Sequence, residues 1–102
     1  PRIIGELNGQ HVKLAKLIGE FVWHSHAKED ELFYVIEGTL TMEFRDRTEE
    51  IQPGEFLIVP KGVEHRPVAQ EEVSVMLFEP ASTLNTGNAG ESEMTRKELD
   101  RI

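Results

Sequence analysis

The segment His24-Ser25-His26 constrains the fold more than any other part of the chain. Successive side chains of a β-strand point to opposite faces, so two residues with one residue between them share a face. In an α-helix the same two side chains would point about 200° apart. Neutral imidazole nitrogen is a good ligand for divalent transition metals. The spacing therefore predicts an extended backbone and a metal site on which His24 and His26 converge.

Short apolar segments separated by turn residues predict an all-β domain. Residues 32–36 are rich in β-branched and aromatic side chains, and residues 39–45 alternate between polar and apolar. Asn8-Gly9 predicts a tight hairpin. The expected strands cover residues 3–4, 12–17, 21–24, 32–36, 39–45, 56–59 and 73–78. Many short strands punctuated by Gly and Pro indicate an antiparallel sandwich or barrel.

A chain of 102 residues is large enough for one hydrophobic core and too small for two. We expect a single β-barrel domain over residues 1–92, ending in an extended loop from residue 81. Residues 93–102 are expected to form a short helix or a tail. Thr95 and Glu98 have the spacing of a capping box, which marks the start of such a helix.

The composition argues against several functions. A net charge of −8 is unfavourable for binding nucleic acid or an anionic membrane surface. The sequence contains no cysteine, which excludes disulfides and thiolate chemistry and is typical of a cytoplasmic protein. No stretch of 18 apolar residues predicts a transmembrane helix. We therefore expect a cytoplasmic domain with an acidic, solubilising surface.

Glu31 and His65 can complete a set of metal ligands with the first two histidines. Three imidazoles and one carboxylate suit a divalent transition metal, whereas buried His and Glu without partners would be costly. Glu29 and Asp30 are alternatives to Glu31 on composition alone. His11 stands by itself at the start of a strand and is expected at the surface.

The same residues resemble the motifs of the cupin superfamily. The first cupin motif is His-x-His, three or four residues, Glu, six residues and Gly; the second begins with Gly, five residues, Pro-x-Gly, two residues and His. The matching residues are His24, His26, Glu31 and Gly38 for the first motif and Gly54, Pro60, Gly62 and His65 for the second. Two positions depart from the pattern: Gly19 lies one residue too close to His24, and Ala69 stands where the second motif has Asn.

This resemblance implies an antiparallel double-sheet β-barrel of the jelly-roll type, with one divalent metal near its mouth. The metal would be Zn, Fe, Mn or Ni, and the spacing to Gly38 favours Glu31 over its acidic neighbours as the fourth ligand. The chain is similar to small single-domain cupins that are often labelled mannose-6-phosphate isomerase-like. The resemblance also implies a homodimer and a small-molecule ligand inside the barrel.

Two functions follow from this expectation. The first is a metalloenzyme, an isomerase or lyase or a dioxygenase, that acts on a small hydroxy, oxo or sugar-like molecule. The second is a metal-dependent binding or sensing module without turnover. Ala69 in place of Asn favours the second function, as does the scarcity of acid–base groups at the expected inward positions. Lys28 and Lys61 lie in loops beside the motifs, where they could meet an anionic ligand.

Strand alternation predicts which side chains share the interior with the ligands. If Glu31 points inward, Phe33 and Val35 do too, whereas Tyr34 and Ile36 lie on the other face. Phe21 and Trp23 are expected on the outside, where they need cover from this chain or from a second copy. For the strand over residues 73–78 either parity is compatible with the sequence: Val73, Val75 and Leu77 inside, or Ser74, Met76 and Phe78.

Overall fold

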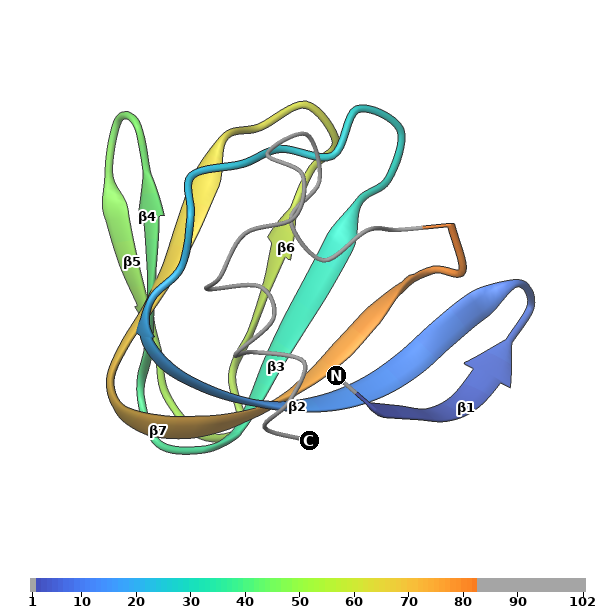
Figure 1. The fold of residues 1–102 in the computed structure, drawn as a ribbon, viewed down its shortest axis with the longest axis horizontal. Coiled ribbons are helices and arrows are strands. Elements are labelled where there is room, and N and C mark those ends of the chain that lie inside the picture. Colours follow the sequence, from blue (N-terminus) through green and yellow to red (C-terminus); the bar gives the residue numbers. More distant parts are fainter. Residues whose placement is uncertain (1, 83–102) are drawn as a thin grey trace.

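The computed structural model describes residues 2–82, which form seven strands that pair only in antiparallel fashion (Figure 1). The strands are β1 (Arg2–Leu7), β2 (Gln10–Glu20), β3 (Glu31–Glu37), β4 (Leu40–Phe44), β5 (Thr48–Ile51), β6 (Phe56–Val59) and β7 (His65–Pro80). The all-β prediction is confirmed. The expected terminal helix over residues 93–102 and most of the preceding loop lie outside the described residues.

β7 connects the two layers of the barrel. The strand order is β1-β2-β7-β3-β6, and β4 pairs with both β5 and β7. Residues 73–80 of β7 lie beside β2, and residues 74–78 also pair with β3, whereas residues 65–68 pair with β4. Figure 1 shows β2 and β7 curving together so that β4 and β5 face β3 and β6. The double-sheet barrel is therefore one hydrogen-bonded sheet folded over on itself.

The hairpin between β1 and β2 forms where Asn8-Gly9 predicts it. Both turn residues have positive φ, 50° for Asn8 and 79° for Gly9. Two consecutive residues with positive φ make the type I′ turn, whose twist matches that of the flanking strands.

The strand expected over residues 21–24 is not regular. Phe21 N donates to Pro67 O at 3.0 Å and His24 N donates to His65 O at 3.1 Å. Three steps along this segment thus match two steps along β7, so an extra residue interrupts the ladder. Only the His24–His65 bridge remains. Strict alternation is lost as well: the Phe21 ring, expected on the outside, lies edge-on to the His24 ring at 5.6 Å.

The core fills the space between the two layers. Its buried apolar side chains are Ala15, Phe33, Val35, Leu40, Met42, Phe44, Ile51, Val59, Ala69, Val73, Val75 and Leu77. The parity of the last strand is therefore decided in favour of Val73, Val75 and Leu77. Phe33 and Val35 are buried together with Glu31, as predicted, whereas Ile36 on the opposite face is 48% exposed.

Trp23 is covered by this chain itself. The Arg45 guanidinium lies 3.8 Å from the centroid of the Trp23 ring, and that of Arg66 lies 5.5 Å away. Arg66 is held there by Glu43 on β4, with Nη2 at 2.7 Å from the carboxylate. Arg66 thus points away from the neighbouring His65, as the alternation of β7 predicts.

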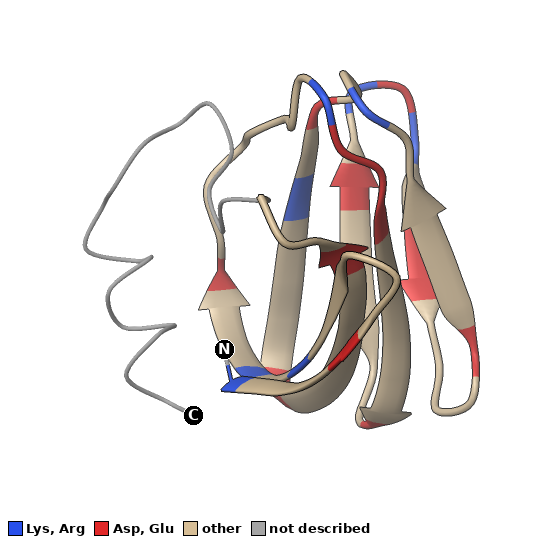
Figure 2. Ribbon diagram, turned by 90° about the vertical axis from the view of Figure 1, so that its right-hand side faces the viewer, with Lys and Arg blue, Asp and Glu red and all other residues tan. Residues whose placement is uncertain are grey.

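Acidic residues outnumber basic ones in this chain, 19 to 11. Figure 2 shows acidic segments spread over several strands and loops of the described chain, in keeping with the net charge of −8. Within residues 2–82, no helix is long and apolar enough to cross a membrane.

Among the glycines of residues 2–82, Gly38 at the end of the first motif is predicted to be the least tolerant of substitution. Its φ is +88°, and an added Cβ would lie 2.9 Å from Glu72 O and 3.1 Å from Val73 Cα. Gly38→Ala should destabilise the protein by about 3 kcal/mol, because steric overlap adds to the left-handed strain. Denaturant unfolding measures this loss.

Gly54→Ala is the matched control for that measurement. Gly54 has nearly the same φ, +86°, but nothing lies within 4 Å of its added Cβ. Only the strain should remain, about 1–2 kcal/mol. Equal losses in the two variants would contradict the role assigned to the contact with β7.

Candidate metal centre

His24 and His65 are brought together by their own backbones. His24 N donates to His65 O at 3.1 Å and His65 N donates to His24 O at 2.9 Å, so the two residues form a narrow antiparallel pair. The side chains of such a pair leave the sheet on one face, and here the ring centroids are 4.3 Å apart. The first motif and the second motif therefore meet at this bridge.

Hydrogen bonds to the backbone orient both rings. His24 Nδ1 lies 2.8 Å from Val22 O, and His65 Nδ1 lies 3.0 Å from Val63 O. A carbonyl oxygen can only accept, so each Nδ1 carries a proton, and in the neutral form of the ring Nε2 is the atom with the free lone pair. Metal-binding histidines in proteins are typically held in this way.

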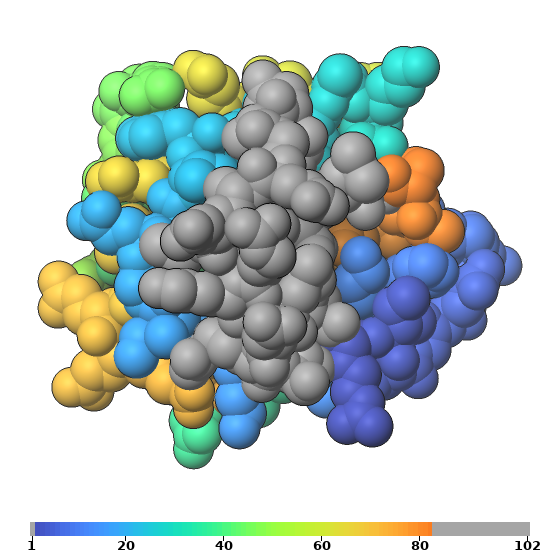
Figure 3. Space-filling view, viewed as in Figure 1, coloured from blue at the N-terminus to red at the C-terminus, as the bar shows by residue number. Residues whose placement is uncertain are grey.

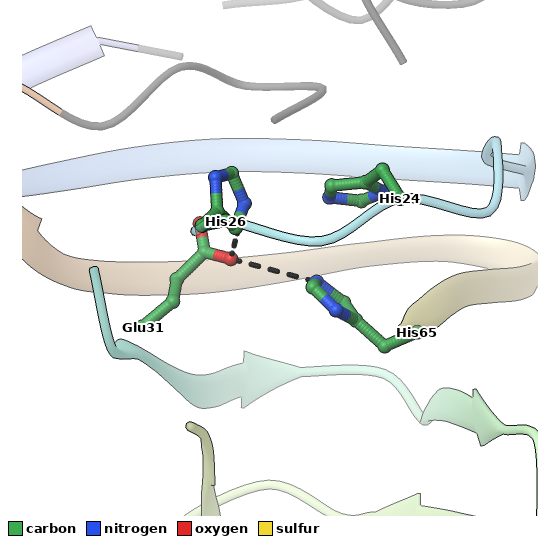
Figure 4. Close-up of side chains that lie close together, drawn as sticks. All are labelled: His24, His26, Glu31 and His65. Carbon is green, nitrogen blue, oxygen red and sulfur yellow. Dashed lines mark ion pairs between the residues drawn. The ribbon is translucent and has the colours of Figure 1, made fainter. Parts of the chain in front are cut away.

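His26 and Glu31 approach from the chain that leads into β3. Glu31 is the first residue of β3 and pairs with Val59 of β6. Its Oε1 lies 3.3 Å from His26 Nε2 and 3.7 Å from His65 Nε2 (Figure 4). His26 is two residues after His24, and Gly62 N donates to its carbonyl at 2.8 Å. A backbone hydrogen bond therefore joins the loop that precedes β7 to the loop that precedes β3.

The four side chains fit a metal ion. One ligand atom from each of His24, His26, Glu31 and His65 lies within 4.8 Å of all the others, and all four residues are buried. Two ligand atoms on one tetrahedral zinc ion would be about 3.4 Å apart, and Glu31 Oε1 lies at 3.3 Å and 3.7 Å from the Nε2 atoms of His26 and His65. His26 Nε2, Glu31 Oε1 and His65 Nε2 are buried without a hydrogen-bond partner. Such atoms are costly unless something binds them, and a divalent metal suits this donor set.

The electrostatics of the cluster favour the metal-binding protonation states. Burial lowers the pKa of His24 from 6.5 to about 4, and repulsion from His65 and His26 adds to this. Burial alone would raise the pKa of Glu31, but close polar contacts with His26, His65 and Glu79 outweigh it and hold the pKa well below its usual range. Near neutral pH the cluster therefore presents a neutral His24 and a carboxylate.

The sequence alternatives to Glu31 lie elsewhere. Asp30 accepts a hydrogen bond from Lys61 N at 2.8 Å, and Glu29 accepts one from Ser82 Oγ at 2.9 Å. His11 lies on β2, where it pairs with Glu79 of β7, and it does not belong to the cluster of four side chains. Its side chain is 19% exposed, so it is less accessible than the sequence predicts.

Sequence reasoning did not identify two polar residues of the interior, Lys13 and Glu79. Lys13 Nζ lies 2.6 Å from Glu79 Oε1, and the two side chains are 10% and 1% exposed. Burial and the neighbouring Glu31 carboxylate raise the pKa of Glu79 to about 8, against the opposing effect of Lys13. The available signal was parity: once Val73, Val75 and Leu77 point inward, Glu79 must follow.

Comparisons with known proteins agree with this architecture. Residues 10–80 match the cupin domain family. A cupin-2 domain protein from Shewanella frigidimarina is 54% identical, with a TM-score of 0.77 and 78% of each chain covered. Protein NMB1881 from Neisseria meningitidis is 35% identical, with a TM-score of 0.72, over 79% of this chain and 83% of that one.

Among curated proteins, the uncharacterized protein YdbB of Bacillus subtilis is 44% identical over 64 residues. The match spans 62% of this chain and 57% of the length of YdbB. The names of these three relatives state no activity, and none of them carries the mannose-6-phosphate isomerase-like label.

The lowered pKa of His24 predicts a pH-dependent stability for the metal-free protein. The unfolded chain protonates His24 near pH 6.5, whereas the folded chain does so only near pH 4. As the pH falls through this window, the His24 contribution to folding should be lost, by up to about 3 kcal/mol. The comparison is between wild type and His24→Gln, unfolded by denaturant in the presence of a chelator.

Because the glutamine does not titrate, the wild type should lose stability relative to His24→Gln between pH 6.5 and pH 4. A constant difference across this range would show that the ring is not held neutral by burial.

Proposed function

We propose that this chain, which belongs to the cupin domain family, binds one divalent transition metal through the His24, His26, Glu31 and His65 cluster and uses it to act on a small polar molecule. The molecule would be a hydroxy, oxo or sugar-like compound; a sugar phosphate, as the mannose-6-phosphate isomerase-like label implies, is one member of this class. Zn, Fe, Mn and Ni all suit the donor set.

The observation that supports this proposal most is the set of unpaired polar atoms. Three of the four ligand residues have a buried nitrogen or oxygen without a hydrogen-bond partner, and these atoms converge. Four protein ligands leave one or two coordination positions for the small molecule, and an open position distinguishes a catalytic site from a closed structural one.

A bound divalent metal would polarise a carbonyl or hydroxyl oxygen of the small molecule or, as iron, would supply oxygen chemistry. The chain's own residues prepare the site for this. His24 and His65 hold their Nε2 lone pairs toward the centre through the bonds to Val22 and Val63. The Phe33 ring lies 6.4 Å from the His65 ring and gives that side of the cluster an apolar neighbour.

A binding or sensing module without turnover is the alternative function. Ala69 is 1% exposed and packs in the apolar core, so no amide is available at the position where cupins have Asn. Turnover assays distinguish the two functions. Oxygen consumption by iron-loaded protein tests the dioxygenase, and product analysis with manganese- or zinc-loaded protein tests the isomerase or lyase.

His65→Ala is predicted to abolish metal binding, because it removes both a ligand and the ring that faces His24. The measurement is metal content by mass spectrometry on protein purified without chelators, where the wild type should hold about one equivalent per chain. His11→Ala is the matched control, since it removes a histidine outside the cluster, and it should keep the full metal content. Full retention in His65→Ala would contradict the site.

We also propose that the protein is a homodimer, joined through the outer face of the sheet formed by β6, β3, β7 and β2. The strand registers place two apolar rows across this face. One row is Phe56, Tyr34, Met76 and Leu14, and the other is Ile58, Leu32, Phe78 and Val12. Phe56 is 61% exposed and Ile58 is 51% exposed. Contiguous exposed apolar surface of this kind is typical of an interface.

Phe56→Glu is predicted to convert the dimer to a monomer, because the new charge would be desolvated at the interface. Light scattering at micromolar concentration measures the mass. Phe56→Tyr, which keeps the aromatic ring, should remain a dimer. A wild type that is monomeric at every concentration tested would refute the proposed interface.

A further inference from the structure

Lys13 and Glu79 lie on the same inner face as the metal-ligand cluster. β2, β7 and β3 are neighbours, and both Lys13 and Phe33 pair with Leu77 of β7. Glu79 is two residues beyond Leu77, and Glu31 is two residues before Phe33. Because the strands are antiparallel, Glu79 and Glu31 occupy adjacent inward positions. Figure 3 shows the end of β7 against the start of β2, where Gln10 pairs with Pro80.

The contacts form a continuous buried polar path. Lys13 Nζ lies 2.6 Å from Glu79 Oε1. Glu79 in turn contacts the carboxylate of Glu31, whose Oε1 is 3.3 Å from His26 Nε2. Neither oxygen of Glu79 makes a hydrogen bond of good geometry. The Lys13 ammonium is therefore directed into the interior, one carboxylate away from the metal ligands.

Stability alone is a weak explanation for this pair. Burying two charges costs several kcal/mol per ion, and apolar residues of similar volume are often as stabilising or more so. The adjacent inward residues on the same strands, Ala15 and Leu77, are apolar core residues. The Lys13–Glu79 ion pair lies beside the metal-ligand cluster, which indicates that it helps to bind the ligand of that site.

The charges of the buried side chains predict the sign of the charge on the bound small molecule. The positive charge of Lys13 and the negative charge of Glu31 cancel. A divalent ion in the cluster adds two positive charges, and Glu79 opposes at most one of them. Whether Glu79 is protonated or not, the filled site keeps a positive charge in a region of low dielectric, where an uncompensated charge is costly.

We propose that Lys13 binds the carboxylate of the ligand, which is a small 2-hydroxy or 2-oxo acid whose adjacent oxygen faces the metal-ligand cluster. Glu79 is a positioning residue that holds the Lys13 ammonium. This inference rests on the proposed metal site. It narrows the ligand class from small polar molecules to anions, and it assigns their recognition to a strand residue rather than to the loop residues Lys28 and Lys61.

The test is calorimetric binding of L-lactate and pyruvate to metal-loaded protein, with lactamide and pyruvamide as neutral probes of the same shape. Wild type should bind each acid at least about tenfold more tightly than its amide, the factor expected for one charge-assisted hydrogen bond. Lys13→Met should lose about tenfold or more in affinity for the acids and little for the amides. Lys16→Met removes an exposed lysine from the same strand and should bind like wild type.

Lys13→Met leaves Glu79 buried without its cation and can impair folding. The double variant Lys13→Met/Glu79→Gln removes both charges, and it should fold, keep its metal and show the same loss of acid binding. Equal affinity for acid and amide, no acid binding by metal-loaded wild type, or unchanged acid binding by either Lys13 variant would overturn the proposal. Metal content is measured on the same samples. If the wild type holds no metal, the proposed metal site has failed; if it holds metal but shows one of these outcomes, the Lys13 proposal has failed.

Discussion

The barrel and the metal-ligand cluster both depend on β7, which runs through both layers. β2, β3 and β4 all pair with this strand, so its bend near residues 70–72 places two sheet faces opposite each other. Its first residue, His65, forms the bridge to His24, and its inward parity carries Glu79 to the neighbourhood of Glu31. Backbone hydrogen bonds thus bring His24 and His65 together, and the strand register places the two carboxylates of Glu79 and Glu31 side by side.

Buried polar groups need a hydrogen-bond or charge partner, and in this chain some of them have one and others do not. The Nδ1 atoms of His24 and His65 have backbone partners, whereas the Nε2 atom of His65 and that of His26 have none. The one positive charge of Lys13 faces two carboxyl groups, because Glu79 contacts Glu31 as well as Lys13. Both features support the two proposals, a metal cation bound by the His24, His26, Glu31 and His65 cluster and an anionic ligand bound by Lys13.

Much of the barrel follows from local sequence patterns. Alternation in residues 39–45 predicts β4 and its inward face, because a one-residue slip would expose the whole apolar set. The apolar run over residues 32–36 predicts β3, and its inward face follows once Glu31 points inward. Asn8-Gly9 predicts the first hairpin because two positive φ values are easiest there. Residues 21–24 were less predictable. Their composition favours a strand, but the extra residue opposite β7 breaks the ladder and brings Phe21 against His24.

The sequence by itself determined the all-β fold and the shared face of His24 and His26, since two-residue periodicity is a local property. Glu31 and His65 were named through their resemblance to the cupin motifs. Only the tertiary structure decided the parity of residues 73–79, the cover of Trp23 by two arginines, and the union of Lys13 with Glu79. These depend on which strands become neighbours and in which register. Residues 66 positions apart in the chain, such as Lys13 and Glu79, meet only through the pairing of β2 with β7.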